Sequence, residues 1–253
     1  MKVERKCKIV SKEQMGDAVY MVLEAGDMVR TSFRAPGQFV HVKCGEGLLL
    51  RRPISVCTCY SDEPSDLLTI VFEVRGEGTD WLARRPVGHS LDVLGLAGNG
   101  FTMKPEGRYL LVGGGIGTAP LLQLAAELAA QGVDVDLYAG FRDEPYRVDA
   151  FSAACRSVHI ATDSGRHGHH GFVTDLLDPA KYTAVCTCGP EIMMEKVAKM
   201  CLRAGVRVYV SREAKMACGV GACLGCTCKS KNGGVSVCKD GPVFEGSVLY
   251  ELD

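Results

Sequence analysis

Residues 108–131 read RYLLVGGGIGTAPLLQLAAELAAQ, and this stretch decides how the larger part of the chain folds. An apolar run, Tyr109–Val112, predicts a short strand, and glycines at positions 113, 114, 115 and 117 follow it directly. A helix is expected over Ala119–Gln131. A glycine-rich turn between a buried strand and a helix lets a pyrophosphate approach the amides of the helix, so the stretch predicts a dinucleotide site. A tight turn without a ligand is the alternative.

The residues after this stretch continue to alternate between strand and helix. Strands are predicted at Val135–Tyr138, Ser157–Ala161, Tyr182–Thr187 and Arg207–Val210, with helices or helical turns at Phe151–Cys155, Thr174–Leu177 and Glu191–Ala204. This alternation is typical of a doubly wound parallel sheet.

Two details of the sheet concern a nucleotide. Pro120 departs from the fingerprint of such sites, which usually has a third glycine at that place. Cys188-Gly189-Pro190 again stands between a strand and a helix, at the carboxyl edge where cofactors bind. With Gly115, Gly117 and Pro120, it predicts one wall of a nicotinamide pocket.

The chain before residue 100 shows no long helical period. Six short β-like runs occur there, separated by turn residues: Cys7–Val10, Val19–Glu24, Gln38–Lys43, Ile54–Cys59, Leu68–Val74 and Ser90–Leu94. Strands of this length and spacing predict a closed antiparallel barrel, with one helical insertion at Thr79–Arg84.

Two segments of the barrel carry residues suited to an anionic cofactor. Arg52 can pair with a phosphate through two hydrogen bonds, and Ser55, three residues on, could reach a flavin ring nitrogen. Gly76-Glu77-Gly78-Thr79-Asp80 is a turn into a helix, which also favours an anion. Either segment alone is common in loops without a ligand.

The strongest chemical signal is a group of cysteines near the carboxyl end. The chain has 13 cysteines, and Cys218, Cys223 and Cys226 are followed, after eleven intervening residues, by Cys238, which we expect on a separate strand. This spacing matches plant-type 2Fe–2S ligation, whereas a zinc site, the alternative, usually has two separated pairs of ligands. Glycines in the loop would turn backbone amides toward sulfur. Cys228 has no place in the pattern.

Three histidines, His167, His169 and His170, also resemble a metal patch. They lie on a glycine-rich loop with no thiol nearby, which favours a solvated turn.

The composition narrows the classes of function. A formal net charge of −1 gives no reason to expect nucleic acid or an anionic membrane as a partner. The uncharged run between Arg108 and Glu127 contains four glycines and Pro120, so it predicts no membrane span. A charged amino terminus argues against a signal peptide, and we expect a reducing, cytoplasmic setting for the cysteines.

We predict three domains: an FAD-binding barrel over 1–102, an NAD-binding α/β domain over 103–211 and a 2Fe–2S domain over 212–253.

Together these motifs resemble the ferredoxin reductase family, and within it the electron transfer subunits of dihydroorotate dehydrogenase B. The resemblance is carried by Arg52-x-x-Ser55, Gly115-x-Gly117-x-x-Pro120, Cys188-Gly189-Pro190, the cysteine loop, and Cys238-Lys239-Asp240-Gly241-Pro242-Val243-Phe244. Further support comes from Pro36–Phe39, Gly95–Phe101 and Gly171–Asp175. One departure is Leu96-Ala97, where the family commonly has Pro-Leu; this should alter packing rather than chemistry.

The resemblance implies FAD, a 2Fe–2S cluster and NAD(H), with Cys218, Cys223, Cys226 and Cys238 as the cluster ligands. It assigns FAD binding to the following residues: Arg52, Pro53, Ile54, Ser55, Val71, Phe72, Glu73, Gly78 and Thr79. It also implies a partner subunit that carries FMN, in a heterotetramer with two copies of each chain.

By the same resemblance, the chain is an NAD-dependent oxidoreductase subunit of pyrimidine (UMP) biosynthesis. Electrons pass between NAD(H), FAD and the cluster, and the FMN subunit interconverts dihydroorotate and orotate. No residue of this chain acts as an acid or base on the pyrimidine. A sister branch, the flavin subunit of NADH-dependent ferredoxin–NADP or sulfide oxidoreductases, is the nearest alternative, and a non-enzymatic redox sensor is another.

Nicotinamide choice depends on the residues after the strand at Val135–Tyr138. Asp143 and Glu144 would repel a ribose phosphate, whereas Arg142 would attract one. Two acids against one base, together with the resemblance, favour NADH over NADPH.

Overall fold

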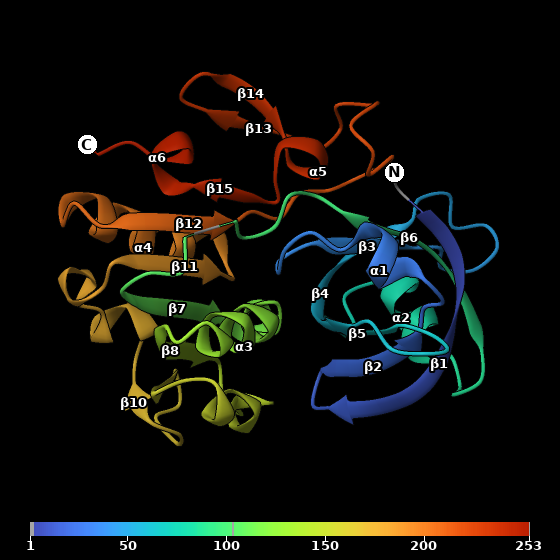
Figure 1. Cartoon of the computed structure of the whole chain (residues 1–253), viewed down its shortest axis with the longest axis horizontal. Helices are drawn as coiled ribbons and strands as arrows, with labels where there is room; N and C mark the ends of the chain where they lie inside the picture. The colour runs from blue at the N-terminus through green and yellow to red at the C-terminus, as the bar shows by residue number, and fades with distance from the viewer. Residues whose placement is uncertain (1–2, 103, 253) are drawn as a thin grey trace. The chain divides into compact units, whose positions relative to one another are not determined.

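The computed structural model describes residues 3–102 and 104–252 (Figure 1). Met1, Lys2, Met103 and Asp253, which include ends of the three predicted domains, lie outside the described residues. The chain forms two compact units. The first runs to Gly100 and includes Glu213–Cys228 and Ser236–Pro242; the second has Phe101–Arg212, Lys229–Val235 and the residues from Val243 onward. The three-domain division stays a prediction.

The first unit is built on the predicted antiparallel barrel, which the structure confirms. Its strands are β1 (Val3–Met15), β2 (Ala18–Glu24), β3 (Phe39–Val42), β4 (Arg52–Tyr60), β5 (Leu67–Glu73) and β6 (Ser90–Ala97). They close in the order β1-β2-β5-β4-β3-β6. Alternate apolar residues fill the interior; on β3, for example, these are Val40 and Val42. Phe39 and His41 of the same strand therefore face outward.

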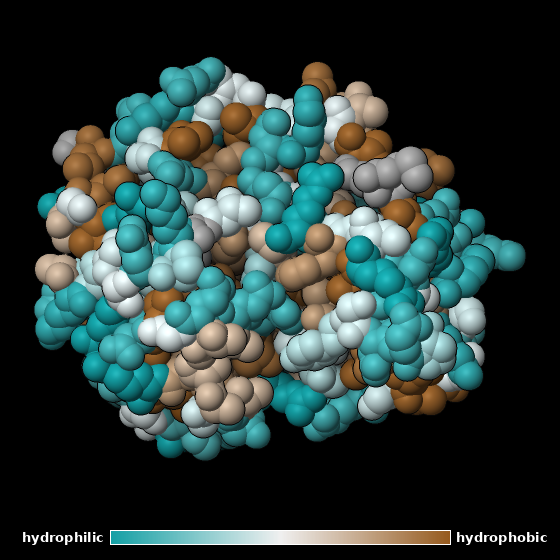
Figure 2. All heavy atoms as spheres, viewed as in Figure 1, coloured by the Kyte–Doolittle hydropathy of each residue, from teal (hydrophilic) through white to brown (hydrophobic). Residues whose placement is uncertain are grey.

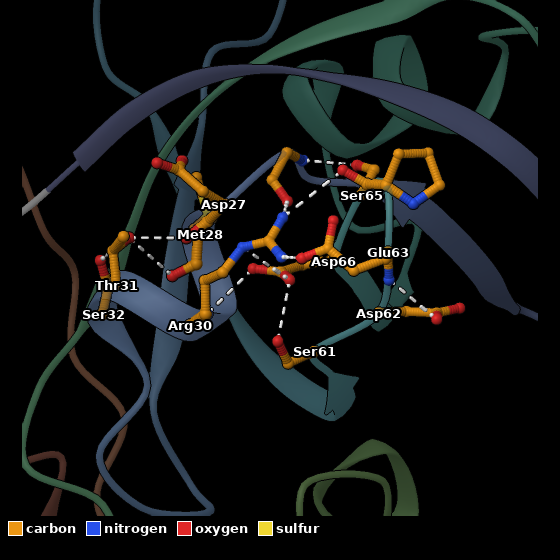
Figure 3. A network of polar contacts seen from close by, with 12 residues as sticks. Asp27, Met28, Arg30, Thr31, Ser32, Ser61, Asp62, Glu63, Ser65 and Asp66 are labelled. Atoms are coloured by element: carbon orange, nitrogen blue, oxygen red, sulfur yellow. Dashed lines mark hydrogen bonds and ion pairs between the residues drawn. The ribbon is translucent and has the colours of Figure 1, made fainter.

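Two short helices accompany the barrel, α1 (Met28–Ser32) and α2 (Glu77–Ala83). The sequence predicted α2, although it begins two residues earlier than expected, and did not predict α1. A polar network holds α1 in place (Figure 3). The carboxylate of Asp66, fully buried, accepts hydrogen bonds from the backbone N–H of Arg30 at 2.9 Å and from the Ser61 hydroxyl at 3.2 Å. Because these partners come from a distant loop, no local pattern marks α1.

The second unit contains a seven-stranded sheet in the order β10-β9-β8-β7-β11-β12-β15. The strands are β7 (Arg108–Gly114), β8 (Asp134–Phe141), β9 (Ser157–Thr162), β10 (His169–His170), β11 (Ala184–Cys188), β12 (Arg207–Ser211) and β15 (Val243–Glu245). All neighbours pair in parallel except β15, which is antiparallel to β12. The sequence predicted neither β10 nor β15.

Helices cover both faces of this sheet, as the predicted doubly wound class requires. They are α3 (Leu121–Ala130) and α4 (Glu191–Arg203), with 3-10 turns η1 (Gly115–Thr118), η2 (Val148–Ala153), η3 (Val173–Leu176) and η4 (Pro179–Lys181). Leu124 of α3 packs in the same apolar cluster as Leu111 of β7, whereas Val197 of α4 packs with Leu110. Adjacent residues of one strand thus point to opposite layers. No helix within the described ranges is long and apolar enough to cross a membrane.

The cysteine-rich segment folds as a hairpin followed by two short helices. These elements are β13 (Thr227–Ser230), β14 (Gly233–Ser236), α5 (Val237–Asp240) and α6 (Gly246–Leu249). The expected strand around Cys238 is wrong, because Cys238 lies in α5. The carboxylate of Asp240 accepts a hydrogen bond from the backbone N–H of Ser236 at 2.8 Å, and this bond closes the turn in place of a continuing strand.

Candidate cofactor sites

Two of the four predicted cluster ligands, Cys226 and Cys238, are in contact in the first unit. The backbone N–H of Cys238 donates to the Cys226 sulfur at 3.4 Å, and the N–H of Gly221 donates to the Cys238 sulfur at 3.1 Å. Cys226 and Cys238 are buried, Cys218 is half-buried and Cys223 is exposed. Cys218, Cys223 and Cys226 lie on one loop and Cys238 lies in the later helix α5, and their role as cluster ligands stays a prediction.

Backbone amides point at each of the four sulfurs. Besides the two contacts above, Val220 donates to Cys218 and Gly225 donates to Cys223, both at 3.4 Å. Hydrogen bonds from N–H groups favour a thiolate over a thiol. The donation from Val220 lowers the pKa of Cys218 to about 6, whereas burial raises the pKa of Cys238 to about 11. Four thiols with amide donors suit the sulfur-rich shell of an iron–sulfur cluster.

Glycine is required at one point of this loop by close packing. Gly219 has φ +63°, and a Cβ added there would lie 2.5 Å from Cε1 of His41 on β3. The loop therefore rests on the outward face of β3. Cys228, which has no place in the predicted pattern, lies on β13, outside the loop and the helix that carry the four thiols.

In the histidine patch, His169 and His170 are exposed and His167 is half-buried. His167 and His169 are paired with carboxylates, namely Glu144 at 3.0 Å and Asp175 at 3.9 Å. Within residues 3–102 and 104–252, nowhere do three or more His, Cys, Asp or Glu side chains converge as they would around a bare metal ion.

The predicted phosphate-binding residues of the barrel lie against one another. Arg52 begins β4, and a Cβ added to Gly78 would be 2.3 Å from its Nε. A side chain at position 78 would therefore displace the guanidinium from its place beside the turn into α2. The hydroxyl of Thr79 accepts hydrogen bonds from the backbone N–H groups of Arg75 at 2.9 Å and Gly76 at 3.2 Å. It therefore shapes the turn, and the backbone there is what a phosphate can reach.

The remaining FAD candidates divide between two faces of the barrel wall. Ile54 and Phe72 belong to the apolar core, so their side chains point inward and only their backbone can meet a cofactor. Strand alternation turns Pro53 and Ser55 of β4, and Val71 and Glu73 of β5, outward. Val56 pairs with Ile70 across the two strands, which brings the outward residues of β4 and β5 side by side. Glu73 is paired with Arg75 at 2.6 Å.

Removing the guanidinium in Arg52→Ala is expected to weaken FAD binding by one to two orders of magnitude. A charge-assisted hydrogen bond contributes roughly 1.5–3 kcal/mol, which is about ten- to more than a hundred-fold in affinity. FAD retention after extended dialysis measures the change. Arg84→Ala, directly after α2, is the control, since it removes the same charge from an exposed ion pair with Asp80. Equal FAD retention by both variants would contradict the role of Arg52.

The two dinucleotide segments of the second unit are in contact. Gly115 and Gly117 form part of η1, and a Cβ added to Gly117 would lie 2.5 Å from the carbonyl oxygen of Cys188 and 2.6 Å from Cα of Gly189. A Cβ on Gly114 would lie 2.6 Å from Cδ of Pro190. Both segments leave the carboxyl ends of adjacent strands, where Cys188 pairs with Gly113. They therefore form one surface at the edge where nucleotides bind in such sheets.

Pro120 is explained by its place at the start of α3. Its φ of −68° is the value that the proline ring imposes and that a first helical turn needs. The departure from the glycine fingerprint therefore costs the helix nothing.

The acidic residues after β8 have partners that the sequence analysis missed. Asp143 is paired with Arg166 at 3.4 Å, and Glu144 with His167 at 3.0 Å. The positive charge of Arg166 thus partly balances Asp143, one of the two acids expected to disfavour a ribose phosphate. Only the parallel pairing of β8 with β9 brings these residues together, so adjacency in sequence did not show it.

Known proteins place the chain in a family. The model of the iron–sulfur cluster binding domain of dihydroorotate dehydrogenase B matches residues 213–250. The chain is 47% identical over 213 residues to the dihydroorotate dehydrogenase B (NAD(+)) electron transfer subunit of Clostridium perfringens, covering 83% of this chain and 85% of that one. It is 40% identical to the Clostridium acetobutylicum subunit, with 97% of each chain covered. The chain belongs to the family of dihydroorotate dehydrogenase B electron transfer subunits.

Solved structures agree with the fold of this family. A chain from the structure of an NADH-dependent reduced ferredoxin–NADP oxidoreductase superposes with a TM-score of 0.87 at 28% identity, covering 96% of this chain and 89% of that chain. The ferredoxin reductase of carbazole 1,9a-dioxygenase superposes with a TM-score of 0.68 at 21% identity, covering 81% of this chain and 67% of that one. The second likeness concerns the fold alone.

Proposed function

We propose that this chain carries electrons between NAD(H) and an FMN-containing catalytic subunit that oxidises dihydroorotate to orotate in pyrimidine biosynthesis. The observation that carries the proposal is the set of four thiols with amide donors, in a chain of this family. When bound, FAD exchanges a hydride with NAD(H) and the cluster passes single electrons, so the cofactors join two-electron to one-electron chemistry. NADH oxidation is then a catalytic activity of this subunit.

The chain's own residues would bind the cofactors and orient them. Arg52 and the Gly78 turn would hold the FAD phosphates, and Ser55 on the outward face of β4 would meet the flavin ring. In the second unit, the Gly115–Gly117 turn would cradle the dinucleotide pyrophosphate, with Cys188-Gly189-Pro190 beside it. No residue of this chain is assigned proton transfer on the pyrimidine; that step belongs to the partner.

The surface around the cysteine loop supports docking of the FMN subunit. Val220 and Leu224 of the loop are 43% and 65% exposed, and Figure 2 shows hydrophobic residues interspersed with hydrophilic ones on the face in view. Lys215 and Lys239 are exposed, and no Asp or Glu occurs between Glu213 and Asp240. Apolar tips within a basic segment suit a partner with an acidic rim. We propose a heterotetramer with two copies of each chain.

We propose a cytoplasmic setting. No disulfide joins any of the 13 cysteines, all of which lie in the described ranges, and a reducing cytoplasm would keep them as thiols.

A second candidate function is favoured by one observation, the superposition on the NADH-dependent ferredoxin–NADP oxidoreductase chain. In that case the same cofactors would serve another partner. The identities of 40–47% with dihydroorotate dehydrogenase B subunits favour the first candidate.

Reconstitution tests the proposal. The pure chain is expected to contain FAD and iron–sulfur, and to reduce an artificial acceptor with a higher kcat/KM for NADH than for NADPH. It should not oxidise dihydroorotate, whereas adding the FMN subunit should produce NAD-linked dihydroorotate oxidation. Co-purification with a ferredoxin–NADP reductase subunit, with no gain from the dihydroorotate enzyme, would favour the second candidate. A higher kcat/KM with NADPH would contradict the cofactor choice.

A further inference from the structure

The loop after β6 is tied to the segment that follows the fourth cysteine. The backbone N–H of Asn99 donates to the carbonyl of Gly241 at 2.8 Å, and the side-chain amide of Asn99 donates to the carbonyl of Asp240 at 2.9 Å. Asp240 ends α5, the helix that contains Cys238. One residue next to the barrel thus makes two hydrogen bonds to the chain directly after a predicted cluster ligand.

The approach of the two segments is close enough to require glycine. Gly98 has φ +82°, and a Cβ added there would lie 2.4 Å from Cδ of Pro242 and 2.9 Å from the carbonyl oxygen of Gly241. The backbone of Gly98 is therefore in contact with the ring of Pro242 and the backbone carbonyl of Gly241. A side chain at position 98 would push the α5 segment away.

The Asn99 loop is in turn anchored to the barrel. The side-chain amide of Gln38 donates to the carbonyl of Gly98 at 3.1 Å, and its own carbonyl accepts from the backbone N–H of Arg34 at 2.8 Å. Gln38 is 2% exposed and directly precedes β3. A continuous path of hydrogen bonds leads from the start of β3, through Gly98 and Asn99, to the end of α5.

The same strand lies beside the predicted flavin strand. Phe39 of β3 is paired in register with Ser55 of β4, and its ring lies 3.2 Å from the Cβ position of Gly98. His41, two residues on, packs against Gly219 of the cysteine loop. The outward face of β3 therefore supports both parts of the ligand set and adjoins the strand assigned to FAD.

We propose that Asn99 is a positioning residue that fixes the segment of Cys238 on the flavin barrel, and thereby sets the spacing between bound FAD and the cluster. The inference rests on the proposed function only in requiring that FAD and the cluster bind where assigned. The step concerned is the transfer of one electron from reduced FAD to the oxidised cluster, with NADH as the source of electrons. Its rate falls steeply with distance, so a small shift of α5 slows it.

Asn99→Asp tests the inference, because it keeps the size of the side chain but places a carboxylate oxygen against the Asp240 carbonyl. Asn99→Ala, which keeps the backbone hydrogen bond, is a second variant in case the first does not fold. Asn232→Asp, in the exposed turn between β13 and β14, is the matched control. Holo-chains are reduced with NADH in a stopped-flow instrument, without any FMN subunit. Flavin reduction, cluster reduction and the electron paramagnetic resonance spectrum are recorded.

Cluster reduction in the Asn99 variants is expected to slow, with an altered resonance spectrum, because the α5 segment loses a hydrogen bond that holds it in place. Flavin reduction and NADH-dependent dye reduction should stay at the level of the control. Cluster reduction at the control rate would overturn the inference. So would an equal fall in flavin and cluster reduction, because that indicates a general loss of structure. Failure of the proposed function would instead appear as no dihydroorotate oxidation by the wild-type chain with the FMN subunit.

Discussion

Replacing Cys238 with serine is expected to remove the iron–sulfur cluster and, with it, all electron transfer to the FMN subunit, while FAD stays bound. The Cys238 sulfur accepts a hydrogen bond from Gly221, and its backbone N–H donates to the Cys226 sulfur, so it links the α5 segment to the loop. A hydroxyl is a poorer ligand than thiolate for the iron of such clusters. Mutating even the outer-shell partners of metal ligands lowers metal affinity or activity by roughly 10–100-fold. Loss of a ligand itself should lower cluster binding by more than this.

The measurements are iron content, visible absorbance and NAD-linked dihydroorotate oxidation with the FMN subunit added. Cys228→Ser is the matched control, since Cys228 lies on β13, outside the elements that carry the four thiols. Iron and activity should survive in this control, as should NADH-dependent dye reduction in both variants. Loss of iron in the Cys228 variant, with iron retained in the Cys238 variant, would contradict the ligand assignment.

Much of this architecture could be predicted because the deciding signals are local. The strand, glycine run and helix around Gly115 are contiguous, and the alternation of elements after them defines a doubly wound sheet without knowledge of any long-range contact. The spacing of Cys218, Cys223 and Cys226 is likewise local, because it defines the loop itself.

The features that sequence reasoning missed depend on partners far away in the chain. The helix α1 is held by Asp66, more than thirty residues later, and β15 exists because β12 offers a free edge. Cys238 lies in a helix where the glycine turn suggested a strand. Strand propensity describes a fit to a half-buried surface, and that surface is defined only once the fold has formed.

The candidate sites likewise depend on contacts between residues that are far apart in the sequence. The motifs at Arg52 and Gly78 were each recognisable, but only the fold shows that the guanidinium occupies the space a Cβ at position 78 would need. Similarly, the ion pair of Asp143 with Arg166 joins two loops and could not be found from either alone. Sequence therefore indicated which residues bear on the chemistry, and the pairing of strands decided which of them meet.

Gly117→Ala is expected to lower the kcat/KM for NADH by roughly a hundredfold, with FAD and iron retained. The added methyl group would lie 2.5 Å from the carbonyl oxygen and 2.6 Å from the carbonyl carbon of Cys188. Both are backbone atoms of β11, so neither can rotate away as a flexible side chain would. The glycine turn or the Cys188-Gly189-Pro190 segment must move, and a displacement near 1 Å at a reacting site can cost about 10²-fold.

Steady-state dye reduction over a range of NADH concentrations measures this loss, and absorbance of the bound flavin confirms that FAD is retained. The control is Gly205→Ala, after α4, where φ is +68° and nothing lies within 4 Å of the Cβ position. That substitution introduces a backbone strain of about 1–2 kcal/mol without any clash, so it lowers stability and leaves kcat/KM unchanged. If Gly117→Ala retained the wild-type kcat/KM, the contact between the two segments would have no part in NADH use. If Gly117→Ala and Gly205→Ala lost activity equally, the loss would come from general backbone strain. Contact with Cys188 could not explain it, because of these two glycines only Gly117 meets the backbone of Cys188.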